Sequence, residues 1–214
     1  MKKIIVSLIC CLLIASCSTK LSTRYYSLQA LPSATIAQSS ATTVQPSTAT
    51  ALALPADITL GISTIKMPSM LNRQGIVSHK TGSSILIASH DIWAGKLKAD
   101  FTRVLAELLA DKLGIHEVVT EPWNTRFRPL YQLQLDVKHF SGTLGGIVRF
   151  KVNWILSGNY GQQKLISNTA NLTLQTSGQD YQAYVSALNT LLATFTTNHV
   201  QSAMFEEIYK QSVN

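Results

Sequence analysis

Cysteine is scarce in this sequence, and every copy lies close to the N-terminus. The chain has three cysteines, Cys10, Cys11 and Cys17. We expect Cys10 and Cys11 to be removed with an N-terminal signal peptide and Cys17 to be acylated. The mature chain would then contain no free thiol, which excludes a disulfide bond, a cysteine metal ligand and a cysteine nucleophile. Its stability would rest on a packed core, for which about 190 residues suffice.

Charged residues are also few, at 14% of the sequence, and they form no basic run. Without Lys2 and Lys3, 16 Lys and Arg remain against 11 Asp and Glu, a net charge of +5. Nucleic-acid-binding proteins concentrate their basic residues in a patch or stripe. The scattered charges therefore argue against a nucleic-acid partner and indicate a solvated, mildly basic surface.

Apolar runs long enough to cross a bilayer are absent as well, since a transmembrane helix needs about 20 apolar residues. The mostly apolar run from Ile4 to Ile14 is shorter and follows Lys2 and Lys3. This order is typical of a secretory signal peptide. We therefore expect residues 1–16 to be a signal peptide that is removed during export.

The residues at the end of this run resemble the lipobox of bacterial lipoproteins. Ile14-Ala15-Ser16-Cys17 places an aliphatic residue and two small residues before a cysteine. The resemblance implies that Cys17 carries diacylglycerol on its sulfur and an N-acyl lipid on its amine, enough chains for stable anchoring. Ser18 replaces the aspartate that retains lipoproteins in the inner membrane of enterobacteria-like species, so it predicts the outer membrane. The alternative is an ordinary signal peptide with an unrelated cysteine.

Glycine and charge are both missing from residues 29–56, which consist of Ala, Ser, Thr, Gln and Pro with a few aliphatic residues. Such a segment cannot build a core, and we predict that it is disordered. Because Arg24–Leu28 before it has the composition of a short strand, the segment is either part of the tether or a long loop inside the domain. In the second case the lipidated cysteine and tether occupy only residues 17–23.

Alternating apolar residues predict strands along the rest of the chain. The clearest pattern is a hairpin in which Tyr131, Leu133, Leu135 and Val137 share one face, and Trp154 lies on the inward face of the partner strand. The predicted strands are Arg24–Leu28, Ile58–Lys66, Gly75–Ser78, Ile85–Ala88, His116–Glu121, Tyr131–Lys138, Val148–Leu156 and about Lys164–Gln175.

Two further segments have the spacing of amphipathic helices. Asp91 is the expected N-cap of a helix from about Ile92 to Leu113, and Asp180 is the expected N-cap of a last helix to about Lys210. Strands with one apolar and one polar face form a sheet that is covered on one side only. The sequence therefore predicts a single two-layer α+β domain over residues 24–214, a mostly antiparallel sheet with two amphipathic helices packed on one face.

Several short motifs in this order resemble a known family, although each is weak alone. They are Tyr25–Leu28, Met67–Arg73 with Ile76-Val77, Trp93–Leu97, Leu135–Val137, Phe140–Gly142, Gly145-Gly146 and Trp154. Together they cover nearly the whole mature chain. The sequence is similar to the ABC-type transport auxiliary lipoproteins, outer-membrane lipoproteins of the paraquat-inducible protein C type. It departs from their pattern mainly in the long segment at residues 29–56.

The resemblance implies a function in lipid transport across the cell envelope. The expected partner is an inner-membrane-anchored, MCE-type periplasmic protein that forms a hydrophobic conduit, and the lipid anchor would hold the protein at the outer membrane. A ring-like homo-oligomer is plausible for the family. The alternative function is a lipoprotein regulator or binding module for cell-wall synthesis, because small α+β folds host both functions.

Catalytic and metal-binding patterns are missing from the sequence. Its five histidines show no ligand spacing. Ser89-His90-Asp91 are adjacent in the chain, so they cannot converge as the members of a catalytic triad do. We expect no enzyme activity, no metal and no cofactor apart from the lipid on Cys17.

Met67, Met70 and Leu71 are the candidate partner-binding residues. They lie in a proline-containing stretch between predicted strands, where no periodicity assigns them to the core. Flexible methionine side chains adapt to varied partner surfaces. The alternative is that these residues cover one end of the sheet and belong to the core.

Overall fold

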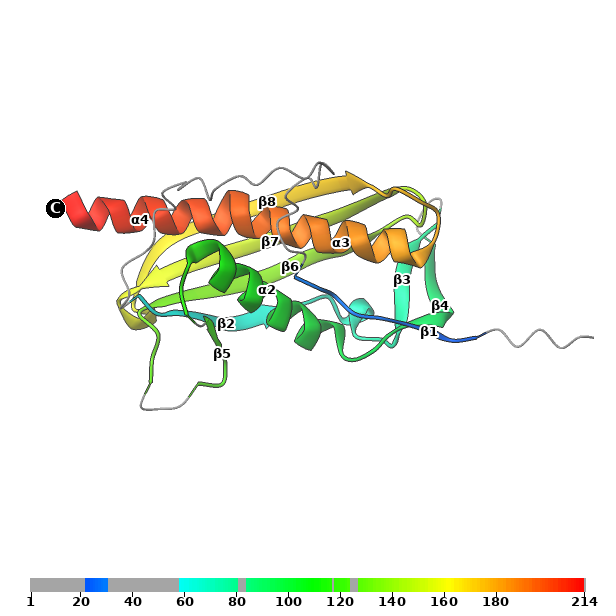
Figure 1. Cartoon of the computed structure of the whole chain (residues 1–214), viewed down its shortest axis with the longest axis horizontal. Coiled ribbons are helices and arrows are strands. Elements are labelled where there is room, and N and C mark those ends of the chain that lie inside the picture. Colours follow the sequence, from blue (N-terminus) through cyan, green and yellow to red (C-terminus); the bar gives the residue numbers. More distant parts are fainter. Residues whose placement is uncertain (1–21, 31–57, 81–83, 117, 124–126, 214) are drawn as a thin grey trace, which may run out of the picture.

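The computed structural model describes residues 22–30, 58–80, 84–116, 118–123 and 127–213. The predicted signal peptide, Cys17 and residues 31–56 of the low-complexity segment lie outside the described residues. The described chain folds as an α+β domain, with strands forming one layer and helices lying across them (Figure 1). This confirms the predicted fold class.

The larger sheet has five strands in the order β5-β2-β6-β7-β8. They are β2 (Leu60–Lys66), β5 (Val118–Thr120), β6 (Tyr131–Gly142), β7 (Ile147–Gly158) and β8 (Gln163–Gln175). The three long strands pair in antiparallel fashion, and Trp154 lies opposite Leu135 as the predicted hairpin requires. The short strand β2 runs parallel to both of its neighbours.

A second, three-stranded sheet stands beside the first and was not predicted as a separate sheet. It contains β1 (Arg24–Tyr26), β3 (Gly75–His79) and β4 (Ile85–Trp93) in the order β1-β4-β3. β1 is parallel to β4, whereas β3 is antiparallel to it. The two sheets meet where His79 of β3 forms a 2.9 Å hydrogen bond with Ser141 of β6.

The helices cover one face of the larger sheet, as predicted (Figure 1). α2 spans Leu97–Leu113, and α3 (Tyr181–Phe195) continues through a π-helical turn at Thr196–Gln201 into α4 (Ser202–Val213). The Asp180 carboxylate accepts the Ala183 N–H at 2.8 Å, so the predicted N-cap of the last helix is confirmed. Two short 3₁₀ turns, η1 (Ser69–Leu71) and η2 (Asn159–Gly161), connect strands.

The predicted N-cap of the first helix is wrong. Asp91 lies inside β4, and α2 begins six residues later in the chain, at Leu97, with Lys96 at the N-cap position and no side-chain cap. The Asp91 carboxylate instead accepts hydrogen bonds from the Tyr26 hydroxyl at 2.9 Å and from Arg24, whose Nε lies 2.8 Å away. This pairing of β4 with β1 outweighs the local preference of aspartate for a helix start.

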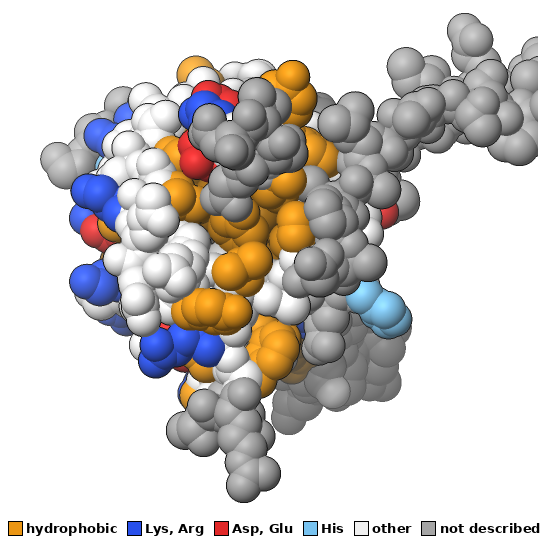
Figure 2. All heavy atoms as spheres, turned by 90° about the vertical axis from the view of Figure 1, so that its left-hand side faces the viewer, with side chains coloured by type: hydrophobic (Ala, Val, Ile, Leu, Met, Phe, Trp, Pro, Cys, Tyr) orange, Lys and Arg blue, Asp and Glu red, His pale blue; other side chains and the backbone are white. Residues whose placement is uncertain are grey.

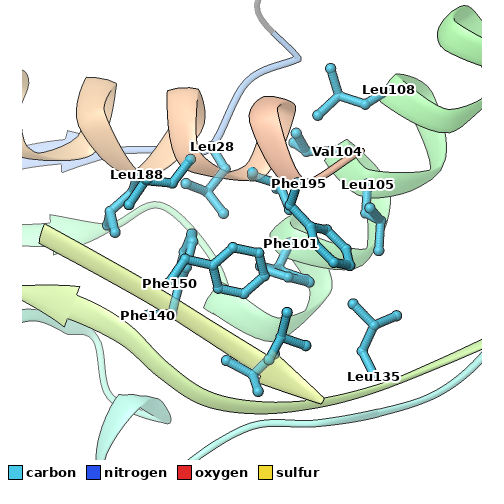
Figure 3. Close-up of a cluster of buried hydrophobic side chains, with 14 of the residues drawn as sticks. Leu28, Phe101, Val104, Leu105, Leu108, Leu135, Phe140, Phe150, Leu188 and Phe195 are labelled. Carbon is cyan, nitrogen blue, oxygen red and sulfur yellow. The ribbon is translucent and has the colours of Figure 1, made fainter. Parts of the chain in front are cut away.

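The core lies between the helices and the larger sheet and is built around aromatic rings. Phe150 of β7 meets Phe140 of β6 and Phe195 of α3 edge to face, each at a centroid distance of 5.3 Å. Figure 3 shows these rings together with Phe101 of α2 and leucines of both helices. Trp154 is 2% exposed and packs against Phe195, in agreement with its predicted inward face. None of the described helices is long and apolar enough to span a membrane.

Candidate functional site

A groove of about 990 Å³ lies between α2 and the end of β2. Its volume is at the upper end of the range of roughly 300–1,000 Å³ that ligand pockets have. One wall is the first three turns of α2, the other is the run from Thr64 to Asn72, and the end of β5 closes one side. The lining residues are Thr64–Ser69, Leu71, Asn72, Lys96, Lys98, Ala99, Thr102, Arg103, Ala106, Glu107, Thr120 and Glu121.

The groove exists because β5 is much shorter than β2. β5 pairs with β2 only over Leu60–Ile62, and the last bond is from the Glu121 N–H to the Ile62 carbonyl at 3.0 Å. Pro122 follows, and proline has no N–H with which to continue a ladder. After an irregularity between Ile62 and Ile65, Ile65 and Lys66 pair with Leu135 and Asp136 of β6. Among the residues that the structure describes, no strand pairs with Thr64–Lys66 on the other side, which is therefore an open edge of the sheet.

The three predicted partner-binding residues divide between groove and core. Leu71 is 4% exposed and belongs to the core, but it also lines the groove. Met67 is half-buried, packs against the core and lines the groove as well. Met70 is half-buried against the core and does not line the groove. The structure thus places Met67 and Leu71 at a site and leaves Met70 outside it.

The charged groups around the groove are mostly cationic. Lys66, Lys96 and Lys98 are exposed, and no salt bridge to another described residue is formed by any of them. Glu107 is paired with Arg103 at 2.9 Å, whereas Glu121 accepts a 3.3 Å hydrogen bond from Thr64. The groove therefore combines an apolar floor with three lysines whose charge is not neutralised inside the domain.

Asp100 joins α2, which forms one wall of the groove, to the residues that follow β1. Its carboxylate accepts hydrogen bonds of 2.8 Å from the Ser27 hydroxyl, the Leu28 N–H and Arg103. Burial alone would raise the pKa of Asp100, but these hydrogen bonds outweigh it and hold the pKa below its usual value. Arg103 in turn donates to the Leu28 carbonyl at 2.9 Å. The segment that follows β1 is therefore hydrogen-bonded to α2.

A second surface feature lies at the end of the domain that is remote from β1. Figure 2 shows hydrophobic side chains gathered at this end, where Figure 1 places α4 and the turn between β7 and β8. Three large exposed residues belong to segments at this end: Phe127 (42% exposed) precedes β6, Tyr160 (50%) lies in η2, and Tyr209 (68%) lies in α4. The Tyr160 N–H bonds to the Leu130 carbonyl at 3.1 Å, which holds the turn against the segment before β6. This apolar end is called the distal surface below.

The described residues contain no group of three or more His, Cys, Asp or Glu that could hold a metal ion. Of the adjacent Ser89-His90-Asp91 residues, Asp91 is turned toward β1 and occupied by Arg24 and Tyr26. What the groove offers is binding chemistry, because a strand edge, an apolar floor and ammonium groups face one space.

These features define an α+β domain with a groove at the edge of its larger sheet, lined by apolar residues and lysines. The sequence model of the family described as "ABC-type transport auxiliary lipoprotein component" matches residues 35–198. This is well over half of the 214 residues, and the chain belongs to this family. The family named by the sequence resemblance is thereby confirmed.

Two of the solved structures that match this chain illustrate the shared fold. The first is described only as an uncharacterized protein, with 21% identity, a TM-score of 0.61, and coverage of 83% of this chain and 95% of that one. The second is protein XCC0632 from Xanthomonas campestris, with 17% identity, a TM-score of 0.59, and coverage of 72% and 87%. No curated protein matches the sequence.

Sequence reasoning missed the lysines and the strand edge. Lys96 falls inside the predicted helix from about Ile92 to Leu113, and Lys66 is the last residue of a predicted strand. The one available signal was Pro122, which ends the short strand before it. That signal gives the length of β5 but not its neighbour, so the open edge beside β2 could not be located.

Proposed function

We propose that the protein is an outer-membrane lipoprotein, acylated on Cys17, that serves a trans-envelope lipid-transport system. It would dock a periplasmic conduit of the MCE type, anchored in the inner membrane, to the outer membrane. The observation that carries this proposal is the family match across most of the chain, which makes the protein an auxiliary transport component. The sequence Ile14-Ala15-Ser16-Cys17 supplies the anchor.

The position of β1 supports the orientation. Residues 18–23 separate Cys17 from Arg24, the first residue of β1, and at about 3.5 Å per residue they reach roughly 20 Å. A lipid on Cys17 would therefore keep the β1 end of the domain close to the membrane. The distal surface, at the opposite end in Figure 1, would then point into the periplasm. Exposed apolar clusters commonly mark protein interaction sites.

Affinity purification of the tagged lipoprotein from crosslinked membranes tests the proposal. We expect the protein in the outer-membrane fraction, together with an MCE-type protein or its ABC permease identified by mass spectrometry. Phe127→Glu on the distal surface should reduce this recovery. Ile147→Glu is the matched control, because Ile147 is similarly exposed but lies beside the turn between β6 and β7, away from that surface.

Two outcomes would contradict the proposal. Recovery of a cell-wall synthase in place of a transport component would favour the regulator of cell-wall synthesis. Fractionation with the inner membrane would exclude the docking role at the outer membrane.

A further inference from the structure

We propose that the groove beside β2 is a strand-addition site for an extended, acidic segment of a partner protein. The segment would pair with the open edge at Thr64–Lys66 and alternate apolar residues with Asp or Glu. The inference rests on the proposed function only in assigning the segment to the transport partner. The site itself follows from the backbone, the shape and the charges of the groove.

The open edge supplies the backbone part of the site. β5 occupies the outer position of the sheet beside Leu60–Ile62 and leaves it empty from Thr64 onward, over the described residues. An edge strand presents unpaired N–H and C=O groups, which a peptide can satisfy by joining the sheet. An added strand would thus continue the line of β5 past the point where Pro122 turns the chain away.

The dimensions of the groove fit a short strand. Its helical wall from Lys96 to Glu107 is roughly 16 Å long at 1.5 Å per residue. An extended chain covers that length with about five residues at ~3.3 Å each. Side chains alternate between the two faces of a strand. One set would therefore contact the apolar lining, including Met67, Leu71 and Ala99, while the other set would lie at the exposed rim that the lysines of the groove share.

The lysines select the charge of the occupant. Lysine on an edge strand discourages pairing with ordinary strands because its charge would face an apolar or basic neighbour. At this edge Lys66 is joined by Lys96 and Lys98 on the opposite wall. A strand that carries carboxylates relieves the repulsion and pairs with these ammonium groups, whereas a basic strand does not. The site therefore favours acidic partners, and its affinity should fall with salt.

An anionic lipid would satisfy the lysines and the apolar floor but not the strand edge. A lipid headgroup has no ordered row of amide donors and acceptors to match Thr64–Lys66. The open edge therefore favours a peptide, and a lipid is the alternative occupant that the test must separate.

Hydrogen exchange and fluorescence anisotropy with a defined probe test the proposal on the full-length lipoprotein in nanodiscs. The probe is labelled acetyl-Val-Glu-Val-Glu-Val-Glu-amide, compared with its Val-Lys counterpart and with a backbone N-methylated copy. We expect the acidic probe to bind and to slow exchange at the amides of Thr64–Lys66. The basic and N-methylated peptides should each bind roughly tenfold more weakly or less.

Variants of the groove complete the test. Lys66→Glu combined with Lys98→Glu should weaken probe binding roughly tenfold, whereas Lys164→Glu on β8 should not change it. Ala99→Trp should fill the groove and block binding, whereas Ser186→Trp on the exposed side of α3 should not. Because all five positions are exposed, unchanged melting temperatures are expected.

Three results would overturn the strand-addition site, and two further results separate it from the proposed function. Absence of probe binding does so, and so does binding that leaves exchange at Thr64–Lys66 unchanged or tolerates N-methylation. Phosphatidylglycerol vesicles that protect the groove while the peptide does not would identify a lipid site instead. If the transport partner is recovered equally well with the groove variants, the groove does not serve that partner and the proposed function stands. If the probe binds but no transport partner is recovered with the wild type, the proposed function fails and the strand-addition site stands.

Discussion

The hydroxyl group of Tyr184 donates a 2.9 Å hydrogen bond to the backbone carbonyl of Val77. The same oxygen accepts the backbone N–H of Gly142 at 2.7 Å. A side chain of α3 thereby joins β3 of the smaller sheet to β6 of the larger one. Burial raises the pKa of Tyr184, so the hydroxyl is protonated and able to donate at neutral pH.

Tyr184→Phe should destabilise the domain by about 1–3 kcal/mol, because it leaves the Val77 carbonyl and the Gly142 N–H buried without their partner. Urea unfolding measures the loss. Tyr25→Phe is the control, since Tyr25 is 67% exposed and its hydroxyl has no hydrogen bond to a described residue; a surface change of this kind stays within about 0.5 kcal/mol. Equal stability of the two variants would show that the link between the sheets is not stabilising.

Asp100→Asn should be less stable than the wild type at neutral pH, and the difference should shrink in acid. The folded-state pKa of Asp100 is lowered, so its charge stabilises the fold above the unfolded pKa of about 3.9. That contribution is lost as the pH falls through the lower, folded-state pKa. Melting temperatures of both proteins from neutral pH down to acid measure this. A difference that stays constant with pH would mean that the effect is one of shape and not of charge.

Trp154→Ala should cost about 3–5 kcal/mol, as large aromatic truncations in a core do. Trp154→Phe should cost much less than the alanine variant. The indole N–H is buried and has no hydrogen-bond partner among the described residues, so phenylalanine removes an unsatisfied donor while keeping a ring against Phe195. Urea unfolding compares the two. A phenylalanine variant as unstable as the alanine variant would show that the indole shape dominates.

Cys17→Ser should abolish acylation and leave an uncleaved or soluble precursor, because the thiol of Cys17 is the expected attachment point. Growth with labelled fatty acid followed by membrane fractionation measures both effects. Ser18→Ala is the matched control and should keep the label. Label on the serine variant would disprove the lipid anchor at this position.

Local patterns in the sequence predicted the elements well where neighbours in the chain are also neighbours in space. The antiparallel hairpin of β6 and β7 is one such case, because alternation alone sets which side chains face the core. The helix after Asp180 is another, since its cap and its buried stripe lie within one segment. The strand at Arg24 was also predicted, but its partner was not.

The predictions were wrong or incomplete where contacts join distant parts of the chain. Asp91 was assigned to a helix start because its bonds to Arg24 and Tyr26 cannot be read from the residues next to it. The separate smaller sheet and the parallel pairing of β2 have the same origin. The groove could not be predicted for this reason either: it depends on β5 ending beside the middle of β2, which is a property of the sheet and not of either strand.

The order of strands in the larger sheet also determines when the domain can fold. β2 is among the first strands along the chain, but its neighbours start only at Val118 and Tyr131, and Leu60 pairs with both. Pairing between segments so far apart is slow to form. If the chain is exported N-terminus first, as proposed above, β2 has no partner until most of the sequence has crossed the membrane. The proposed cleavage and acylation at Cys17 would then act on a chain whose larger sheet has not yet formed.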